Sequence, residues 1–403
     1  MPVVLSLLTA LLAALVAATV AIVVYLLLLT AAALVTRPLA PGRSSRMRRF
    51  AILVPAHNEE AVIGRLMSSL HALDYPRDHF DICVVADNCT DATAEIARGL
   101  GAAVYDRSSE TERAKGFALR WLVGELEREG REYDAYVIVD ADSMVAATFL
   151  ASMNARLDAG AVAIQAYYQV LNAGQSSVAG LRYAALAAVH YLRPLGRSRF
   201  ALSAGLKGNG MCFSAGLLKR FGWNWFTLAE DVEFHLQLVQ AGIRVEFAPE
   251  TWVKAEMPIT LAQAASQNAR WEGGRAQLLR SEVPRLLWAG VRTRSLLRID
   301  AALEQLVPPL SVPFAIGVLA IPLAVGLGNP LLAVVAASSV VGYAAYLLVA
   351  LRLVRAPWSV YLTLSTAPVY VAWKLGLYAR SVASRRSHAW VRTERVASGT
   401  SSN

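Results

Sequence analysis

The chain has 403 residues, of which 56% are hydrophobic and only 17% are charged, and its formal net charge is +9. Soluble domains carry about 25% charged residues, so this composition argues against a wholly soluble protein. A basic balance is also typical of nucleic-acid binding, but the arginines cluster beside apolar stretches, where attraction to anionic lipid headgroups explains them better, so we expect no nucleic-acid partner.

The first element in chain order is an apolar segment. Residues 3–35 contain no charged side chain, and a membrane-spanning helix needs about 20 apolar residues. The segment lacks a basic start and is longer than the apolar core of a signal peptide, so residues 1–36 are predicted to be a permanent anchor. The linker at 37–49 is basic, from Arg37 to Arg49, which predicts that the following domain lies in the cytoplasm beneath the plasma membrane.

Residues 50–258 have the pattern of an α/β domain. Continuous apolar strands separated by helical patterns predict a mostly parallel, Rossmann-type sheet covered by helices on both faces. The expected strands are Ala51–Val54, Ile82–Val85, Tyr136–Val139 and Val162–Ala166. A helix is expected directly after the first strand, with Asn58 as its N-cap. Its apolar stripe would consist of Val62, Ile63, Leu66, Met67 and Leu70.

The chain after this domain is predicted to be helical and associated with the membrane. Residues 259–300 become increasingly basic, and Pro284–Ile299 mixes leucine and tryptophan with arginine, which is typical of a helix in the membrane interface. Residues 306–327 and 331–351 are predicted to span the membrane.

A last apolar segment, residues 358–378, is interrupted by Pro368. A third full span would place the arginines of the basic tail, residues 381–403, outside the cell, against the usual distribution of charge. We therefore expect 358–378 to be re-entrant or interfacial within a multi-pass membrane region at 301–380.

Three of the predicted strands end in polar clusters. His57-Asn58-Glu59 follows the first, Asp87-Asn88 the second, and Asp140-Ala141-Asp142 the third. Ligands of parallel sheets bind beyond the carboxyl ends of the strands. Asp140 and Asp142 would point the same way if the chain is extended, and two adjacent carboxylates favour a divalent cation such as Mg²⁺ or Mn²⁺ between them.

These clusters, with four later motifs, resemble the inverting glycosyltransferases of family 2, which have the GT-A fold. The later motifs are Lys115-Gly116-Phe117-Ala118-Leu119, Gly208-Asn209-Gly210, Ala229-Glu230-Asp231 and Gln267-Asn268-Ala269-Arg270-Trp271. The resemblance covers roughly residues 50–275 and is carried by seven short motifs in the correct order. The last motif is similar to that of the membrane-embedded synthases of hyaluronan, chitin, cellulose and poly-N-acetylglucosamine.

The resemblance implies a nucleotide-sugar donor and places residues around it. Ala56, Glu59 and Asp87 would contact uridine, Lys115 would lie near the nucleotide, and Asp140 would face it. Two departures affect this assignment: relatives often have further aspartates and Gly-Ser after the second strand, where this chain has Ala86 and Asn88-Cys89, and a Thr where it has Ala229.

The resemblance also implies the chemistry at the sugar. Asp142 would bind the divalent cation, and Asp231 would be the general base, a role that an aspartate of ordinary pKa, ionised at neutral pH, can fill. Substrate would further contact Asn209, Gly210 and Glu230. The diphosphate and acceptor end would be covered by Gln267, Arg270 and Trp271.

Two questions stay open at this point. The acceptor is a growing glycan in a polysaccharide synthase, the interpretation that we favour from the sequence, or a lipid in a single-addition transferase. A nucleotide-sensing transporter or receptor is a more remote alternative, because it predicts ionisable residues inside the spans, and 3–35 and 306–351 contain essentially none. The pair Arg270 and Trp271 alone would also suit a helix at lipid headgroups.

Overall fold

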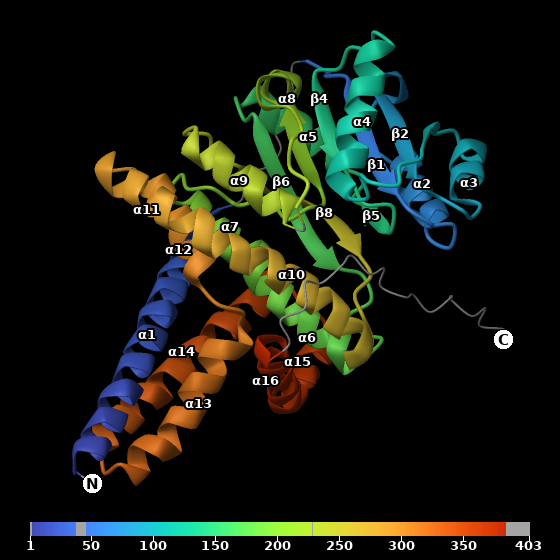
Figure 1. The fold of residues 1–403 in the computed structure, drawn as a ribbon. Helices are drawn as coiled ribbons and strands as arrows, with labels where there is room; N and C mark the ends of the chain where they lie inside the picture. The colour runs from blue at the N-terminus through green and yellow to red at the C-terminus, as the bar shows by residue number, and fades with distance from the viewer. Residues whose placement is uncertain (1, 38–45, 228, 384–403) are drawn as a thin grey trace, which may run out of the picture.

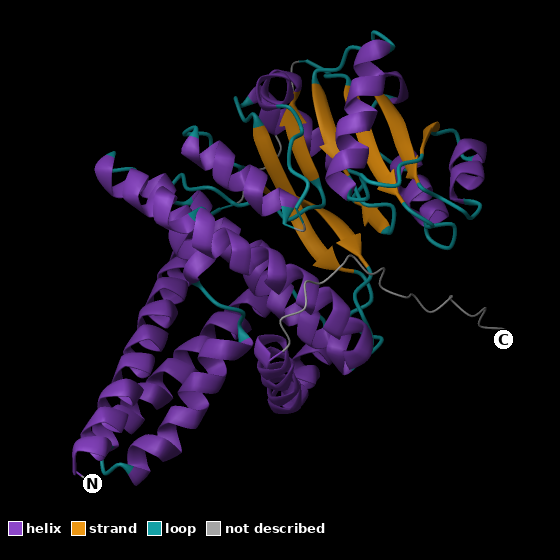
Figure 2. Cartoon of the chain, viewed as in Figure 1, coloured by secondary structure: helices purple, strands orange, loops and turns teal. Residues whose placement is uncertain are grey.

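A computed structural model describes residues 2–37, 46–227 and 229–383; most of the basic linker and of the basic tail lies outside these ranges. An α/β part lies at one end of the molecule and a bundle of long helices at the other (Figure 1). Figure 2 shows all strands gathered in the first part, with helices both around them and beyond them. The fold class expected from the sequence is confirmed.

One eight-stranded sheet forms the centre of the α/β part in the described residues, with strand order β3-β2-β1-β4-β7-β6-β8-β5. β1 is parallel to β2 and β4, whereas β7 is antiparallel to β4 and β6. The four predicted strands are confirmed as β1, β2, β4 and β6. The bounds are β1 Phe50–Ala56, β2 Phe80–Asp87, β3 Ala103–Arg107, β4 Ala135–Ile138, β5 Ser143–Val145, β6 Ala163–Val170, β7 Met211–Ser214 and β8 Glu246–Ala255.

Short helices cover this sheet. They are α2 Ile63–His71, η1 Arg77–His79, α3 Thr93–Gly99, α4 Lys115–Arg128, α5 Phe149–Asp158, α8 Ala215–Phe221 and α9 Glu230–Gln240. The predicted apolar stripe of α2 is buried, but Asn58 is not its N-cap. Asn58 has a left-handed backbone with φ of 55°, and its Oδ1 accepts a hydrogen bond from the Thr90 amide at 2.7 Å. It therefore joins the loops after β1 and β2 instead of starting a helix.

A layer of helices connects the α/β part with the bundle. It consists of α6 Ser177–Leu186, the π-helical turn η2 Ala187–Leu192, α7 Arg193–Ser198, α10 Leu261–Ser281, α11 Val283–Arg292 and α12 Leu296–Leu306. The amphipathic segment expected at 284–299 is divided between α11 and α12, because Arg294 has φ of 51° and ends the first helix. Trp288 on α11 is 64% exposed, as a residue at a lipid surface would be.

The bundle contains α1 Pro2–Val35, α13 Ser311–Gly326 and α14 Pro330–Leu353, which pack against one another. In the described part of the chain, Val3–Val35 and Pro330–Leu353 are long and apolar enough to cross a membrane. The span expected at 306–327 differs: α13 has only 16 residues and contains Pro322. It becomes long enough only together with α12, from which it is bent by 63°.

The segment at 358–378 forms α15 Trp358–Thr363, the 3-10 turn η3 Leu364–Thr366 and α16 Ala367–Ala383. The break falls at η3, just before Pro368, as the sequence predicted. Figure 1 shows α16 nearly end-on while α1, α13 and α14 extend across the view, so α16 runs at a steep angle to them. This arrangement agrees with an interfacial or re-entrant segment, which stays a prediction.

The anchor helix α1 approaches α7 very closely. A Cβ atom built on Gly196 would lie 2.3 Å from the carbonyl oxygen of Leu29. The next residue, Arg197, is fully buried and binds Asp300 at 2.9 Å, Glu304 at 2.8 Å and the Tyr25 hydroxyl at 2.6 Å. A small residue and a buried cation together fix α1 and α12 on α7.

We predict that Gly196→Ala destabilises the protein, because its methyl group would meet the backbone of α1. Overpacking of this kind costs about 1–3 kcal/mol. Gly124→Ala is the matched control, since Gly124 also lies in a helix but has nothing within 4 Å of its Cβ position, and alanine is the better helix former. Thermal unfolding of the full chain in detergent, followed by tryptophan fluorescence, measures both. Equal changes in Tm would contradict the close approach.

Candidate functional site

The three polar clusters meet at one edge of the sheet, because β1, β2 and β4 are parallel neighbours. His57 follows β1, and its Nδ1 lies 2.7 Å from the carbonyl oxygen of Asp87 at the end of β2. Ala56 is buried, and its carbonyl oxygen faces Cys89 Sγ at 3.5 Å. The Glu59 amide donates to Thr93 Oγ1 at 2.7 Å. The structure therefore gathers Ala56, Glu59 and Asp87 around one pair of loops.

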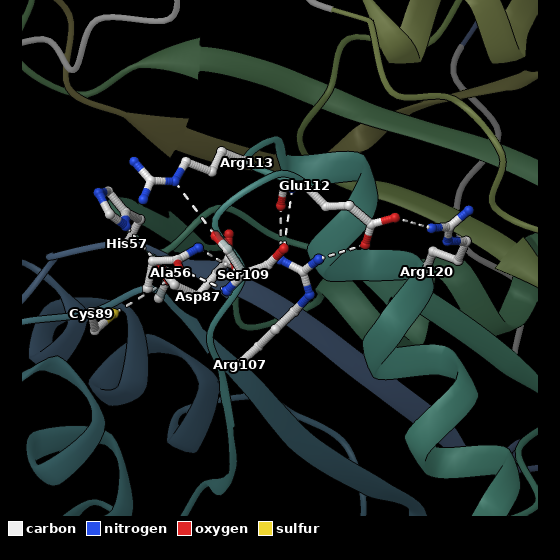
Figure 3. Close-up of polar contacts among 10 residues, drawn as sticks. Ala56, His57, Asp87, Cys89, Arg107, Ser109, Glu112, Arg113 and Arg120 are labelled. Atoms are coloured by element: carbon white, nitrogen blue, oxygen red, sulfur yellow. Dashed lines mark hydrogen bonds and ion pairs between the residues drawn. The ribbon is translucent and has the colours of Figure 1, made fainter.

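Asp87 is held by a buried cation that the sequence analysis missed. Arg107 donates from one nitrogen to Asp87 Oδ1 at 2.6 Å and from the other to Glu112 Oε2 at 2.9 Å, and its side chain is only 5% exposed. Figure 3 shows Arg107 reaching between these two carboxylates from the end of β3. The strand β3 was not predicted, so no sequence signal placed Arg107 at this edge.

Lys115 stands at the first turn of α4 and joins two predicted motifs. Its Nζ lies 2.5 Å from Asp140 Oδ1 and 2.5 Å from the carbonyl oxygen of Gly208. Burial alone would lower the pKa of Lys115, but the nearby Asp140 and Glu230 carboxylates raise the pKa above its ordinary value. Lys115 is thus a firmly charged ammonium group in the site.

Asp142 does not follow Asp140 in an extended chain, as the sequence analysis assumed. Ala141 and Asp142 form a turn between β4 and β5. Asp142 Oδ1 accepts from Ser143 Oγ at 3.2 Å, and Ser143 Oγ accepts from Asn209 Nδ2 at 2.8 Å. Asn209 is fully buried and also receives the Asp140 amide at 3.2 Å. Asn209 therefore holds both ends of this turn.

The turn offers hard oxygen ligands of the kind that Mg²⁺ and Mn²⁺ prefer. No three His, Cys, Asp or Glu side chains are grouped to hold a metal within the residues that the structure describes. A cation at Asp142 would therefore need further oxygens from substrate phosphates, which is usual for Mg²⁺ bound by one or two carboxylates. The donor set fits a divalent cation that arrives with a nucleotide.

The glycine segment after Lys207 needs glycine for two separate reasons. Gly208 and Gly210 have φ of +76° and +67°, in the left-handed region that favours glycine. A Cβ on Gly210 would also lie 2.5 Å from Val253, and one on Gly208 would lie 3.5 Å from Asp231 Oδ2. The segment can therefore lie directly against the carboxylate that was predicted to be the base.

Glu230 and Asp231 open α9 and are half-buried. Burial, followed by the negative charge of Asp231, raises the pKa of Glu230 to about 7. Burial also raises the pKa of Asp231 above the ordinary value assumed in the sequence analysis. A carboxylate with a raised pKa is a stronger base, so the environment suits Asp231 to accepting a proton.

The last motif lies on α10 and is tied to α6. Arg182, which the sequence analysis missed, donates to Gln267 Oε1 at 2.9 Å and to Asn268 Oδ1 at 3.0 Å. The side chains of Arg270 and Trp271 lie outside the described part of the structure, so their predicted contacts stay predictions. Arg182 is buried and joins two helices that are far apart in sequence.

Tyr168, near the end of β6, lies close to Asp140 and Asp142 and to His190 on η2. Burial and the negative charges of Asp142 and Asp140 raise the pKa of Tyr168, whereas Arg182 acts in the opposite direction. The Tyr168 ring stacks on His190 with 5.3 Å between the ring centroids. The predicted strand stopped at Ala166, so this residue was also missed.

Comparisons with known proteins identify the family of the chain. Residues 48–274 match the family described as glycosyltransferase-like family 2. The chain is 25% identical over 235 residues to a probable glycosyltransferase, YdaM, of Bacillus subtilis, covering 56% of this chain and 55% of that protein. It is 30% identical over 236 residues to the β-monoglucosyldiacylglycerol synthase of a Nostoc species, covering 55% of this chain and 48% of that protein. The chain thus spans about half the length of both curated relatives.

A solved structure supports the fold over a larger part of the chain. The mannosyltransferase PcManGT of Pyrobaculum calidifontis, in complex with GDP-Man and Mn²⁺, superimposes with a TM-score of 0.52 at 20% sequence identity. The match covers 84% of this chain and 97% of that one. With a family match over more than half of its length, the chain belongs to glycosyltransferase-like family 2.

Proposed function

We propose that the protein transfers a sugar from a nucleotide-diphosphate sugar to an acceptor hydroxyl in one inverting displacement, with Asp231 as the general base. One observation carries this proposal. Lys115, Asp140 and the half-buried Glu230–Asp231 pair converge on the glycine segment at Gly208. The positive charge of Lys115 and the Asp231 carboxylate, whose pKa is raised, therefore lie close together.

The donor is proposed to enter along the edge formed by β1, β2 and β4. Its nucleoside would lie against Ala56, Glu59 and Asp87, where Arg107 fixes the Asp87 carboxylate. Uridine is the expectation from the sequence, and the solved structure that superimposes on this chain is a complex with GDP-Man. Donors of both kinds therefore belong in the first screen.

The reaction needs stabilisation of the leaving diphosphate and removal of a proton. A divalent cation, held by Asp142 with Asp140 beside it, would supply electrostatic stabilisation of the diphosphate. Lys115 adds a partly buried positive charge close to the same turn. Asp231 takes the proton of the acceptor hydroxyl as its oxygen attacks the anomeric carbon from the face opposite the leaving group.

We further propose that the catalytic part lies at the cytoplasmic face of the plasma membrane, with α1 and α14 in the bilayer. Two helices of sufficient length and hydropathy support this. The sequence by itself favours a growing glycan as acceptor. The similarity to a β-monoglucosyldiacylglycerol synthase and the apolar cavity described below support a lipid acceptor better.

We predict that Asp231→Asn lowers nucleotide release by about 10²- to 10⁴-fold, the usual contribution of a general base. Asp142→Ala should also lower release strongly, because the cation loses its protein ligand. The assay measures release of UDP or GDP from UDP- and GDP-sugars with Mn²⁺, by purified full-length protein in membrane-like particles. Asp78→Asn, an 80% exposed carboxylate, is the control and should keep the wild-type rate. Full release by both site variants would refute the assignment.

The pH dependence of the reaction should report the carboxylate pair. As the pH rises through about 7, Glu230 loses its proton, and the new negative charge makes the adjacent Asp231 a stronger base. We therefore expect the rate to rise with pH through this region and to fall on acidification. In Glu230→Gln this step should disappear from the pH–rate profile, since no proton is exchanged at that position. A step near pH 7 that persists in Glu230→Gln would contradict the explanation.

A further inference from the structure

A cavity lies between the α/β part and the bundle. Its volume is about 480 Å³, and its wall comes from α6, η2, α10, α13, α14, η3 and α16. Figure 1 shows α6, α14 and α16 meeting beneath α10. Most of the lining is apolar, as at Leu181, Phe314, Leu347 and Tyr370. A cavity of this size and character is typical of a binding site for a small, mainly apolar molecule.

Three polar atoms of this wall have no hydrogen-bond partner within the described residues. They are Asn268 Nδ2, Ser311 Oγ and Tyr343 Oη, in residues that are 1%, 9% and 4% exposed. Buried polar groups are almost always hydrogen-bonded in folded proteins. Each of these atoms is also shielded from solvent, so a molecule in the cavity would reach them only once the lining side chains move.

The charged side chains of the cavity wall indicate which charge a bound molecule would carry. Arg182 and Lys374 line the cavity, and the lining residues include no aspartate or glutamate. His190 is neutral at this wall, because burial, with the nearby Lys207, lowers its pKa to about 3. The wall therefore combines an apolar surface with net positive charge, which complements an anionic amphiphile.

The cavity adjoins the candidate site in two places. Asn268 is the neighbour of Gln267 in the α10 motif, and Arg182 binds both side chains. His190 stacks on Tyr168, which lies close to Asp140 and Asp142. A molecule held by Asn268 and Arg182 would thus present its polar end towards the site of transfer.

We propose that this cavity binds the acceptor of the reaction, an anionic membrane lipid whose head carries a phosphate and a free hydroxyl. This inference rests on the proposed sugar transfer. The acyl chains lie against α13, α14 and α16, and the phosphate lies near Arg182 and Lys374. A hydrated glycan would find few hydrogen-bond partners on so apolar a wall, which disfavours it as the occupant.

The transfer step is balanced with this acceptor. The lipid hydroxyl oxygen forms a bond to the anomeric carbon while the bond between that carbon and the diphosphate oxygen breaks. The bonding electrons leave with the nucleoside diphosphate, and the hydroxyl proton passes to Asp231. The products are a glycosylated lipid, a nucleoside diphosphate and one proton, with no oxidant or reductant involved.

Binding is tested apart from catalysis. Full-length protein in phosphatidylcholine nanodiscs is exposed to phosphatidylglycerol with a photoreactive acyl chain, and mass spectrometry locates the label. We expect label on α6, α14 and α16. Ala344→Trp should abolish it by filling the cavity that Ala344 lines. Ala345→Trp is the matched control, because Ala345 is an exposed neighbour on the same helix that does not line the cavity.

Competition identifies the head group. Unlabelled phosphatidylglycerol should displace the probe about tenfold better than diacylglycerol, and Lys374→Gln should remove this preference, because hydrogen bonds to a charged partner contribute on that order. Glycerol phosphate, which lacks acyl chains, should not compete. Lys374→Gln also keeps the test valid if a tryptophan variant fails to fold, which thermal unfolding would reveal.

The outcomes separate the two proposals. Equal labelling of Ala344→Trp and Ala345→Trp, or equal competition by diacylglycerol and phosphatidylglycerol, would overturn the lipid site even if nucleotide is released from the donor. Competition by glycerol phosphate alone would assign the cations to a soluble phosphate instead of a lipid. Absence of nucleotide release with every donor would refute the sugar transfer, while specific labelling would still establish the lipid site.

Discussion

The buried guanidinium of Arg197 is the interaction on which the relation between the two parts of the molecule depends. It binds Tyr25 on α1 and both Asp300 and Glu304 on α12, so one cation from α7 fixes two neighbouring helices. Removing one partner of such a group leaves uncompensated buried charge, which costs about 3–5 kcal/mol. Glu304 also lies 3.8 Å from Lys207 Nζ, and the charge of Lys207 acts on Asp231. The packing of α1 is therefore linked to Asp231, the proposed base, through three charged groups.

The candidate site itself depends on a buried amide. Asn209 binds the Asp140 backbone and the Ser143 hydroxyl, and its own carbonyl oxygen receives Gln165 at 2.8 Å. The left-handed glycines on either side allow this residue to lie deep in the sheet while Gly208 faces Lys115 and Asp231. Residues from β4, β6, α4 and α9 are thus brought to one locus by a segment of three residues, and each of them is fixed before substrate arrives.

The sequence predicted the site residues whose positions follow from local strand endings. It missed the residues whose roles depend on contacts with other parts of the fold. The polar clusters after β1, β2 and β4 could be predicted, because parallel strands end at a common edge whatever their loops do. Arg107, Arg182 and Tyr168 could not, since each acts through partners distant in the chain. The turn at Asp142 and the left-handed backbone of Asn58 were missed for a different reason. Hydrogen bonds to distant parts of the chain determine both conformations, whereas strand periodicity and helix-capping rules predict an extended chain and an N-cap. The metal, the base and the contacts of the α10 motif were assigned through family resemblance and stay predictions.

The cavity is lined by residues of the family-matched region, which ends at residue 274, and by residues that follow it in the chain. Leu181, Arg182 and Asn268 belong to the matched region, whereas Phe314, Tyr343 and Lys374 come from the helices that follow it. If the cavity holds the acceptor as proposed, donor chemistry and acceptor choice depend on largely separate stretches of the chain. On the proposed arrangement, substitutions in the C-terminal helices can diversify the acceptor over evolutionary time while the donor edge is left untouched. Exchange of those helices between relatives is the corresponding route for engineering a new glycolipid product.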